Sequence, residues 1–168
     1  MKTRHPLASD LEEILAGTRG LWEELRGGSI FITGATGFFG CWLLESFAWA
    51  NQRLGLGAHA TILTSNPDTL RNKLPHLASS VDVIVGDVRS FTFPDGNFSH
   101  VIHAATESSA ELNANNPQLM FDTIVEGTRH CLDFAEHRVF SARLRSCRNG
   151  LTLGRGGATA LGCEPAID

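Results

Sequence analysis

Apolar residues follow two different periods along the first 137 residues of the chain. Four short apolar runs bounded by glycine or polar residues are typical of buried strands. They span residues 29–33, 60–64, 81–87 and 100–106. Between them, apolar residues recur every three or four positions, as in amphipathic helices, at residues 9–26, 39–50, 67–74 and 117–136. This alternation predicts an α/β fold, with helices on both faces of a parallel sheet.

The ends and apolar faces of these helices follow from the same pattern. A helix is expected to begin at Asn66 and again at Asn116, because in each case an Asn cap precedes a Pro at the first helical position. Ser9 and Glu12 fit a capping box for the first helix. The apolar faces carry Phe39, Leu43, Phe47 and Ala50 in the second helix and Phe121, Ile124, Thr128, Leu132 and Ala135 in the last.

The pattern ends at about residue 138. The segment from there to Asp168 is rich in Arg, Gly and Ala and has no sustained period, so no secondary structure is predicted for it. The chain is therefore expected to comprise a helical extension at residues 1–27, a sheet-forming portion of about four strands at residues 28–137, and an aperiodic tail at residues 138–168.

Composition narrows the possible partners. The 168 residues include 14 Lys and Arg against 18 Asp and Glu, so no basic field favours nucleic acid or an anionic membrane. No apolar run is long enough to cross a membrane and the N-terminus is too acidic for a signal peptide, so a cytoplasmic location is expected. The four cysteines include no C-x-x-C pair. Neither a disulfide framework nor a metal site is expected.

Three glycines follow the first strand and open the second helix. In the sequence FITGATGFFG, Gly34 would allow a tight turn, Gly37 would let a pyrophosphate approach the backbone, and Gly40 would let the helix pack closely on the strand. The free N–H groups and the dipole of the helix would then attract the negative charge. No Lys follows the glycines, which argues against a triphosphate P-loop. A plain glycine-rich turn is the alternative interpretation.

Four motifs in order give the chain a family resemblance. They are ITGATGFFG at 32–40, GDVRSF at 86–91, VIHAAT at 101–106 and VEGTRHCLDFA at 125–135. With them, residues 28–137 resemble the NAD-dependent epimerase/dehydratase branch of the extended short-chain dehydrogenase/reductase superfamily, whose members act on nucleotide sugars. The resemblance implies an incomplete Rossmann-like sheet with strand order 3-2-1-4 and a cofactor at the carboxyl ends of the strands.

The resemblance also implies the cofactor-binding positions. Besides Gly34 and Gly40, these are Thr36, Gly37, Phe38 and Phe39 for the pyrophosphate, Asp87 and Val88 for the adenine, and Ala104, Ala105 and Thr106 for the nicotinamide ribose. Asp87 could instead cap a loop, and Ala104 with Ala105 could simply allow close packing. The family favours NAD, but the second strand ends in LTSN, without an acidic residue for the ribose, so NADP stays open.

The chain departs from the family pattern in its chemistry. Members of the family use a Tyr-x-x-x-Lys pair, whereas this sequence contains no Tyr and its last Lys is Lys73. No catalytic residue is therefore assigned. Ile124 stands where the long helix usually carries an Asn that anchors it to the sheet. His100 and His103 lie on opposite faces of their strand and so cannot share a metal ion. His103 is expected to be a packed residue or one that supports a neighbouring side chain.

Three interpretations follow for the whole chain. The first is the NAD-binding part of a nucleotide-sugar epimerase or dehydratase, which on its own would not turn over substrate but could form a homodimer. The second is a non-catalytic regulatory module that binds a dinucleotide. The third is a non-functional truncated product with an exposed fourth-strand edge. A shift of the coding frame near His137 would explain the tail.

Overall fold

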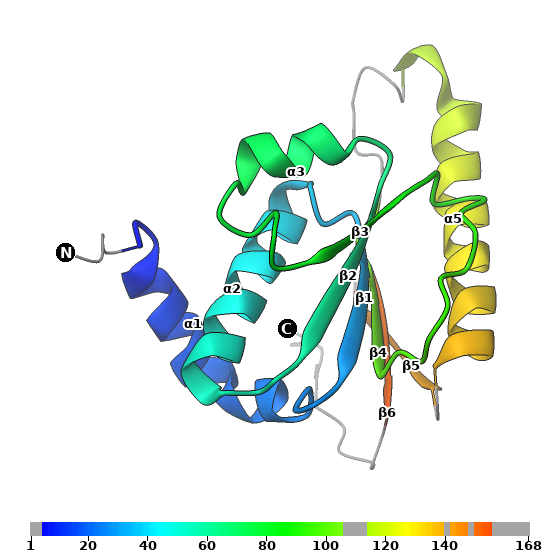
Figure 1. Ribbon diagram of the computed structural model, residues 1–168. Helices are drawn as coiled ribbons and strands as arrows, with labels where there is room; N and C mark the ends of the chain where they lie inside the picture. The colour runs from blue at the N-terminus through cyan, green and yellow to red at the C-terminus, as the bar shows by residue number, and fades with distance from the viewer. Residues whose placement is uncertain (1–4, 106–113, 140–141, 148–149, 156–168) are drawn as a thin grey trace, which may run out of the picture.

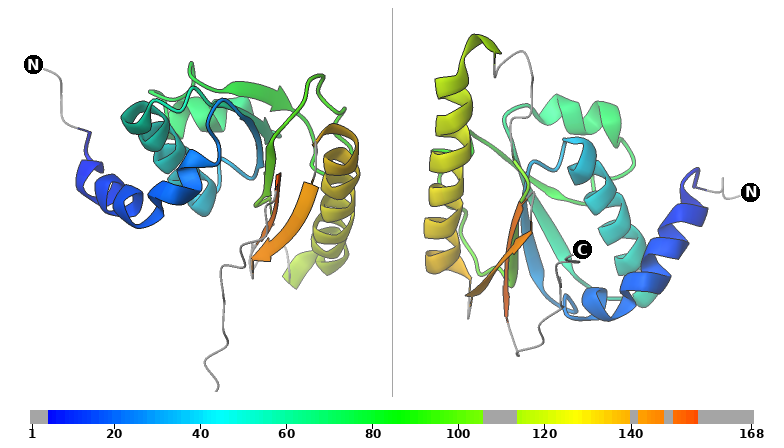
Figure 2. Two further views of the ribbon diagram at one scale, coloured as in Figure 1. Left: turned by 90° about the horizontal axis from the view of Figure 1, so that it is seen from below. Right: turned by 180° about the vertical axis from the view of Figure 1, so that it is seen from behind.

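The computed structural model describes residues 5–105 and 114–139, and the backbone of residues 142–147 and 150–155. The described chain forms a single six-stranded sheet with the order β3-β2-β1-β4-β6-β5 (Figure 1). Helices cover both faces of this sheet, as Figure 2 shows from two further directions. The architecture is therefore the α/β layer arrangement that the alternating pattern predicts.

Four parallel strands make up the first part of the sheet. They are β1 (Ser29–Thr33), β2 (His59–Thr64), β3 (Asp82–Val85) and β4 (His100–His103). In the central register, Ile32 of β1 lies between Ile62 of β2 and Ile102 of β4. This confirms the parallel sheet with the order 3-2-1-4. The third strand is not buried as predicted, because it lies at the edge of the sheet, where Val85 is 61% exposed.

An antiparallel hairpin extends the sheet beyond the predicted strands. It consists of β5 (Ala142–Cys147) and β6 (Gly150–Arg155), and β6 pairs with β4. The tail was predicted without secondary structure, so this is a correction. The edge of β4 that the third interpretation required to be exposed is covered by β6. Because the hairpin is stabilised by pairing with a distant strand, local periodicity in the tail does not reveal it.

Helices on one face of the sheet are α1 (Ala8–Glu23), α2 (Phe38–Leu54) and α3 (Pro67–Lys73), and α5 (Pro117–Arg138) covers the other (Figure 1). The side chain of Asn66 accepts a hydrogen bond of 3.0 Å from Asp68 N, and that of Asn116 accepts one of 3.1 Å from Leu119 N. Both predicted caps are confirmed. The predicted capping box at Ser9 is wrong, because α1 begins at Ala8 with Leu7 as an N-cap that makes no side-chain bond.

The core between α1–α3 and the sheet is mostly aliphatic and includes Leu15, Ile32, Leu44 and Ile62, with Phe47 as its buried aromatic residue. The buried row of α2 is Gly40, Leu44, Phe47 and Ala50. The predicted row was partly wrong, because it began one position earlier, at Phe39, whose side chain is 65% exposed. Two adjacent rows of α2, one beginning at Phe39 and one at Gly40, are similarly apolar. The row with Gly40 is the buried one, because only a glycine can lie against Ala35 at this position.

The core under α5 is aromatic. Phe31 of β1 lies 4.5 Å from Phe134 and 5.4 Å from Phe91 between ring centroids, and Phe93 and Phe98 also contact Phe134. Each such aromatic pair stabilises the fold by about 0.5–1.5 kcal/mol beyond the free energy gained by burying the rings.

The buried residues of α5 are Gly127, Cys131, Phe134 and Ala135. The predicted apolar row of this helix is therefore mostly wrong, because Phe121 is 60% and Ile124 is 37% exposed. Phe134 determines the orientation of the helix by filling the space beside Phe31. Gly127 contributes as well, because a side chain there would meet Cγ1 of Val88 at 2.9 Å.

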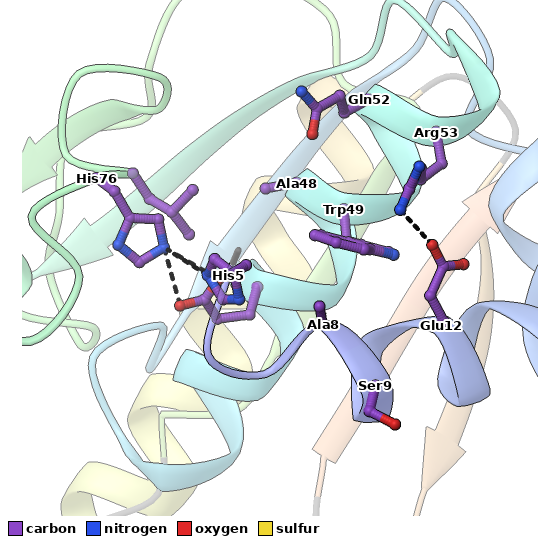
Figure 3. A pocket seen from close by; sticks show the side chains of 11 residues that line it. His5, Ala8, Ser9, Glu12, Ala48, Trp49, Gln52, Arg53 and His76 are labelled. Carbon is purple, nitrogen blue, oxygen red and sulfur yellow. Dashed lines mark hydrogen bonds and ion pairs between the residues drawn. The ribbon is translucent and has the colours of Figure 1, made fainter. Parts of the chain in front are cut away.

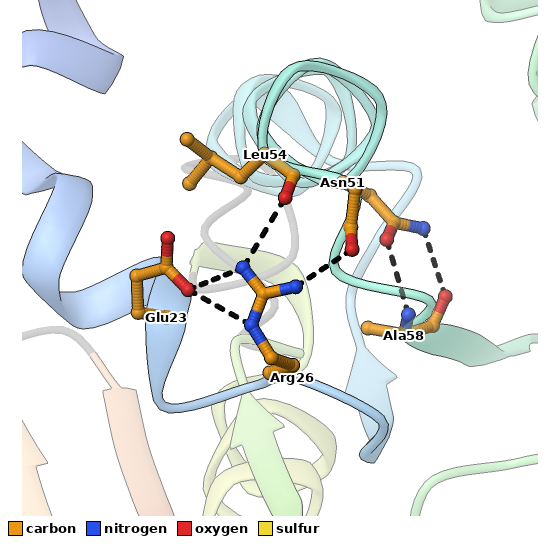
Figure 4. Close-up of polar contacts among 6 residues, drawn as sticks. Glu23, Arg26, Asn51, Leu54 and Ala58 are labelled. Atoms are coloured by element: carbon orange, nitrogen blue, oxygen red, sulfur yellow. Dashed lines mark hydrogen bonds and ion pairs between the residues drawn. The ribbon is translucent and has the colours of Figure 1, made fainter.

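The turn from α2 to β2 is held by two side chains (Figure 4). Asn51 donates to the carbonyl oxygen of Ala58 at 2.8 Å and accepts from Ala58 N at 3.0 Å. Arg26, which follows α1, donates to the carbonyl oxygens of Leu54 and Gly55, the C-cap of α2. These bonds fasten the end of α1 to the end of α2.

In the part of the chain described here, no helix is both long and apolar enough to cross a bilayer.

Candidate functional site

The glycine turn lies between the ends of two neighbouring strands. Gly34 follows β1 with a positive φ of 71° and lies against the backbone of Ala104 and Ala105, which follow β4. A side chain on Gly34 would overlap Ala104 and would come within 2.5 Å of Ala105 N. Only glycine therefore fits both the left-handed conformation and the close approach of the two strand ends. The prediction of a tight turn at Gly34 agrees with this geometry.

The turn leads into the positive end of α2. Gly37 is the N-cap residue, and its carbonyl oxygen accepts the first bond of the helix, from Cys41 N at 3.0 Å. The N–H groups of the three residues between them have no acceptor within the helix. No side chain caps this end and its first turn has no acidic residue. These donors and the helix dipole therefore form a position suited to an anion.

A cavity of about 300 Å³ opens beside this turn, at the carboxyl ends of the four parallel strands. It is lined by Thr33, Gly34, Thr36, Leu63, Thr64, Ser65, Gly86, Asp87, Val88, Arg89, Ala105, Leu119 and Thr123. Segments far apart in the sequence therefore meet in the crevice where the strand order reverses, between β1 and β4, which is where open α/β sheets bind ligands.

The cavity brings together five of the predicted cofactor-binding residues: Gly34, Thr36, Asp87, Val88 and Ala105. Five more predicted positions lie around it. The side chains of Phe38 and Phe39 are exposed, at 73% and 65%. Gly37 caps α2, Gly40 packs on Ala35, and Ala104 lies behind Gly34. Thr106 lies outside the described residues.

The carboxylate of Asp87 is fixed by Arg89. Arg89 donates from its backbone N at 2.8 Å and from Nε at 3.0 Å to Oδ1, and from Nη2 at 2.6 Å to Oδ2. The side-chain hydrogen bond from Arg89 is the largest cause that lowers the pKa of Asp87. Asp87 thus caps its loop and lines the cavity at the same time. Arg89 was not predicted, although it lies within the GDVRSF motif.

A lysine also reaches the glycine turn. Nζ of Lys73, the last residue of α3, donates a hydrogen bond of 2.7 Å to the carbonyl oxygen of Thr36. It places a positive charge beside the N-terminus of α2, next to the proposed anion position. The sequence carries no signal for this contact, because the two residues are 37 positions apart.

A buried hydrogen-bond network positions Ala105. The hydroxyl oxygen of Thr33 lies 2.7 Å from Nδ1 of His103 and accepts a bond of 3.3 Å from Ala105 N. Both Thr33 and His103 are buried. Burial lowers the pKa of His103, which favours a neutral imidazole able to accept the Thr33 proton. His103 is therefore a packed residue, as predicted.

The same histidine connects β4 to α5. Nε2 of His103 lies 3.3 Å from the hydroxyl of Thr128, and Nδ1 lies 3.4 Å from Sγ of Cys131. The helix therefore has a polar anchor on the sheet, although Ile124 stands where an Asn was expected. Burial raises the pKa of Cys131 to about 12, so its thiol is unsuited to act as a nucleophile.

A second polar cluster lies in an open cleft between the start of α1 and α2 (Figure 3). It consists of His5, Glu45 and His76, whose ligand atoms lie within 4.8 Å of one another. The sequence analysis missed this cluster. Only the complete fold reveals it, because at least 31 positions separate its members along the chain.

Comparisons with known proteins show which family and which solved structures the chain resembles. The model of the NAD dependent epimerase/dehydratase family matches residues 30–148. Among solved structures, the chain is similar to the epimerase Mth375 from Methanothermobacter thermautotrophicus, at 19% identity and a TM-score of 0.54. Fibrillarin from Aeropyrum pernix, with bound S-adenosyl-L-methionine, is similar at 11% identity and a TM-score of 0.37, over 78% of this chain and 67% of that one. None of the curated proteins matches.

The similarity to Mth375 concerns the fold. It covers 79% of this chain but only 36% of the Mth375 chain, so this chain spans little more than a third of that length. The family match spans residues 30–148, which include the glycine turn, Asp87, the Ala104–Ala105 segment and α5. The chain belongs to the NAD dependent epimerase/dehydratase family.

Proposed function

We propose that this chain is the NAD-binding part of a protein related to nucleotide-sugar epimerases and dehydratases. The observation that carries the proposal is the cavity at the strand ends, where the glycine turn meets Asp87 and Ala105. The proposed division of the chain is the one expected from the sequence, with residues 28–137 as the cofactor-binding portion and residues 1–27 as a helical extension. A cytoplasmic location belongs to the same proposal.

The residues present fit a dinucleotide. A pyrophosphate would lie at the N-terminus of α2, against the backbone from Thr36 to Phe39, where helix N–H groups and the charge of Lys73 attract an anion. A side chain on Gly37 would lie 3.2 Å from Gly34 O, in the space that a pyrophosphate would use. Asp87 and Val88 would contact the adenine. Ala104 and Ala105, followed by Thr106, would lie beside the nicotinamide ribose.

The choice between NAD and NADP depends on the end of β2. Thr64 and Ser65 line the cavity there and carry no charge. An acidic residue at this position would bind the ribose hydroxyls and repel a 2′-phosphate. Without that repulsion, NADP is not disfavoured. It is not favoured either, because Arg89 is already paired with Asp87 and is not free to bind a 2′-phosphate. We propose NAD because the family favours it, and we expect only weak discrimination against NADP because the end of β2 carries no acidic residue.

The chain holds the cofactor but does not supply the proton transfer of the family. The sequence has no Tyr, so it contains no Tyr-x-x-x-Lys pair. When bound, NAD would supply a hydride acceptor. We propose that the conversion of a nucleotide sugar requires residues that this chain does not contain. The chain alone is then a binding protein, and its nucleotide-sugar substrate is a property of a longer relative.

Equilibrium titration with NAD⁺ and with NADP⁺ tests this proposal. Micromolar binding of NAD⁺ without turnover of a panel of nucleotide sugars is the expected result. Turnover would contradict the assignment as a binding part, and absence of binding would favour a non-functional product. A regulatory module is the second candidate, and it predicts that NAD⁺ changes the affinity for a partner protein. Light scattering with and without NAD⁺ tests the proposed homodimer.

The coding sequence tests the origin of the tail. The proposed frame shift near His137 predicts family-like residues, including a Tyr-x-x-x-Lys pair, in another frame downstream of codons 135–150. An uninterrupted frame in the genes of related organisms would contradict the hypothesis.

A further inference from the structure

We infer that His5, Glu45 and His76 form a binding site for a divalent transition-metal ion, with Zn²⁺ as the best-fitting ion. His5 precedes α1, Glu45 lies on α2, and His76 follows α3. The bound ion would fasten the segment before α1 to the body of the domain. This inference is independent of the proposed NAD site, because the two clefts share no lining residue.

The spacing of the three ligand atoms fits one ion. Nε2 of His5 lies 3.4 Å from Nε2 of His76 and 3.3 Å from Oε2 of Glu45, and Nε2 of His76 lies 3.1 Å from the same Oε2. Ligands about 2.0–2.1 Å from a tetrahedral Zn²⁺ lie about 3.3–3.4 Å from one another. The three atoms therefore already have nearly the mutual distances that coordination of Zn²⁺ requires.

The donor set also fits Zn²⁺. Two imidazole nitrogens and one carboxylate are a common set of protein ligands for Zn²⁺, with a fourth position left for water. The side chain of His76 is 45% exposed, so an ion and its water can enter from solvent. All three residues line an open cleft of about 1110 Å³, which gives the fourth position access to water.

The burial of the carboxylate gives a second argument. Glu45 is only 6% exposed, and a buried carboxylate is costly unless a positive group compensates it. A divalent ion held between the three side chains would supply that positive charge.

Binding has one local cost. Nδ1 of His5 lies 3.3 Å from the backbone N of Leu7, from which it accepts a hydrogen bond. A metal on Nε2 moves the remaining imidazole proton to Nδ1, so this long hydrogen bond is lost. The contact lies in the turn before α1, and its loss is small beside the formation of three metal–ligand bonds.

Calorimetric titration of metal-free protein with Zn²⁺ tests the site. Wild-type protein should bind one Zn²⁺, and Glu45→Gln and His76→Gln should each lower the affinity by about 100-fold or more, above the loss typical of second-shell changes. His59→Gln, which alters an exposed histidine outside the cluster, should bind like wild type. Circular dichroism establishes that each variant is folded. Wild-type affinity in either cluster variant, or absence of binding by wild type, would overturn the inference.

Tryptophan fluorescence tests the position of the ion. The ring of Trp49 lies 5.9 Å from that of His5, so a paramagnetic Co²⁺ in the site should quench its emission strongly. Saturable quenching by Co²⁺ should disappear in Trp49→Phe and be reversed by an excess of Zn²⁺. Quenching that remains unchanged in Trp49→Phe would place the ion elsewhere and contradict the site.

Discussion

Gly34 lies directly against the peptide that joins Ala104 to Ala105, where β1 and β4 end side by side. This contact brings the glycine turn and the end of β4 to the same cavity. It exists because the order of the strands reverses between β1 and β4, which separates the two βα connections and leaves a crevice. Cofactor binding in this account depends on that crevice.

Replacing Gly34 should destabilise the fold. Gly34→Ala combines a positive φ of 71° with overlap against Ala104, so a loss of about 2–4 kcal/mol in the free energy of unfolding is expected. Gly37→Ala is the matched control. Its φ is −74° and its new methyl group would meet only Gly34 O, at 3.2 Å, so a loss below about 1 kcal/mol is expected. Urea denaturation measures both; equal losses would refute the assigned geometry.

The turn between α2 and β2 should depend on Asn51. Asn51→Ala removes both bonds to the backbone of Ala58 and leaves its N–H and carbonyl without these partners, so a loss of about 1–3 kcal/mol is expected. Gln52→Ala changes an exposed neighbour on the same helix and should cost less than about 0.5 kcal/mol. Thermal unfolding distinguishes the two variants. A similar midpoint for both would show that Asn51 does not hold the turn.

Stability should fall in mildly acidic solution because of His103. Burial holds the pKa of this imidazole below the ordinary value of 6.5, so the unfolded chain takes up a proton before the folded chain does. The free energy of unfolding should therefore decrease as the pH falls below about 6.5. In His103→Gln the decrease between pH 7 and 5.5 should be smaller. Denaturation curves at several pH values test this; identical slopes for both proteins would contradict it.

Cys131 should react with thiol reagents only after unfolding. Its pKa of about 12 leaves almost no thiolate at pH 8, and the side chain is buried. In a variant with Cys147→Ser and Cys163→Ser, the half-buried Cys41 should react slowly in the native state and Cys131 should not. Both should react in denaturant. Modification of Cys131 at the rate of Cys41 in native protein, followed by mass spectrometry, would rule out its burial.

Much of the parallel sheet could be predicted from the sequence. The strand at residues 29–33, the glycine turn and the Asn-Pro starts at Asn66 and Asn116 each depend on neighbouring residues, so local pattern suffices for them. The strand order needed the family resemblance as well. Five of the predicted cofactor-binding residues line one cavity for the same reason, because the motifs lie at the ends of strands.

Tertiary packing determined the features of the fold that the local sequence pattern could not predict. The α5 row with Phe121 is as apolar as the row with Phe134, and only the space beside Phe31 determines which is buried. The hairpin of β5 and β6 depends on pairing with β4. Val139, which follows α5, makes a parallel bridge to Phe98, and this contact too joins residues far apart in the sequence.

The sequence pattern also did not reveal the long-range polar contacts. Lys73 contacts Thr36, and Glu45 contacts His5 and His76, across 31 to 40 positions of sequence. No local motif connects them, because α3 and the segment before α1 approach α2 only in the folded chain. Such contacts can be found in the structure but not in the pattern of residues.

Calorimetric titration of NAD⁺ into wild-type protein and Gly37→Ala tests whether the glycine turn binds the cofactor. Wild type should bind one NAD⁺ with micromolar affinity, and the affinity of Gly37→Ala should be at least about tenfold lower, because the added methyl group occupies the approach to the backbone at the start of α2. The variant should remain folded. Absence of NAD⁺ binding by folded wild-type protein, or equal affinity in the two proteins, would show that the turn is not the binding site.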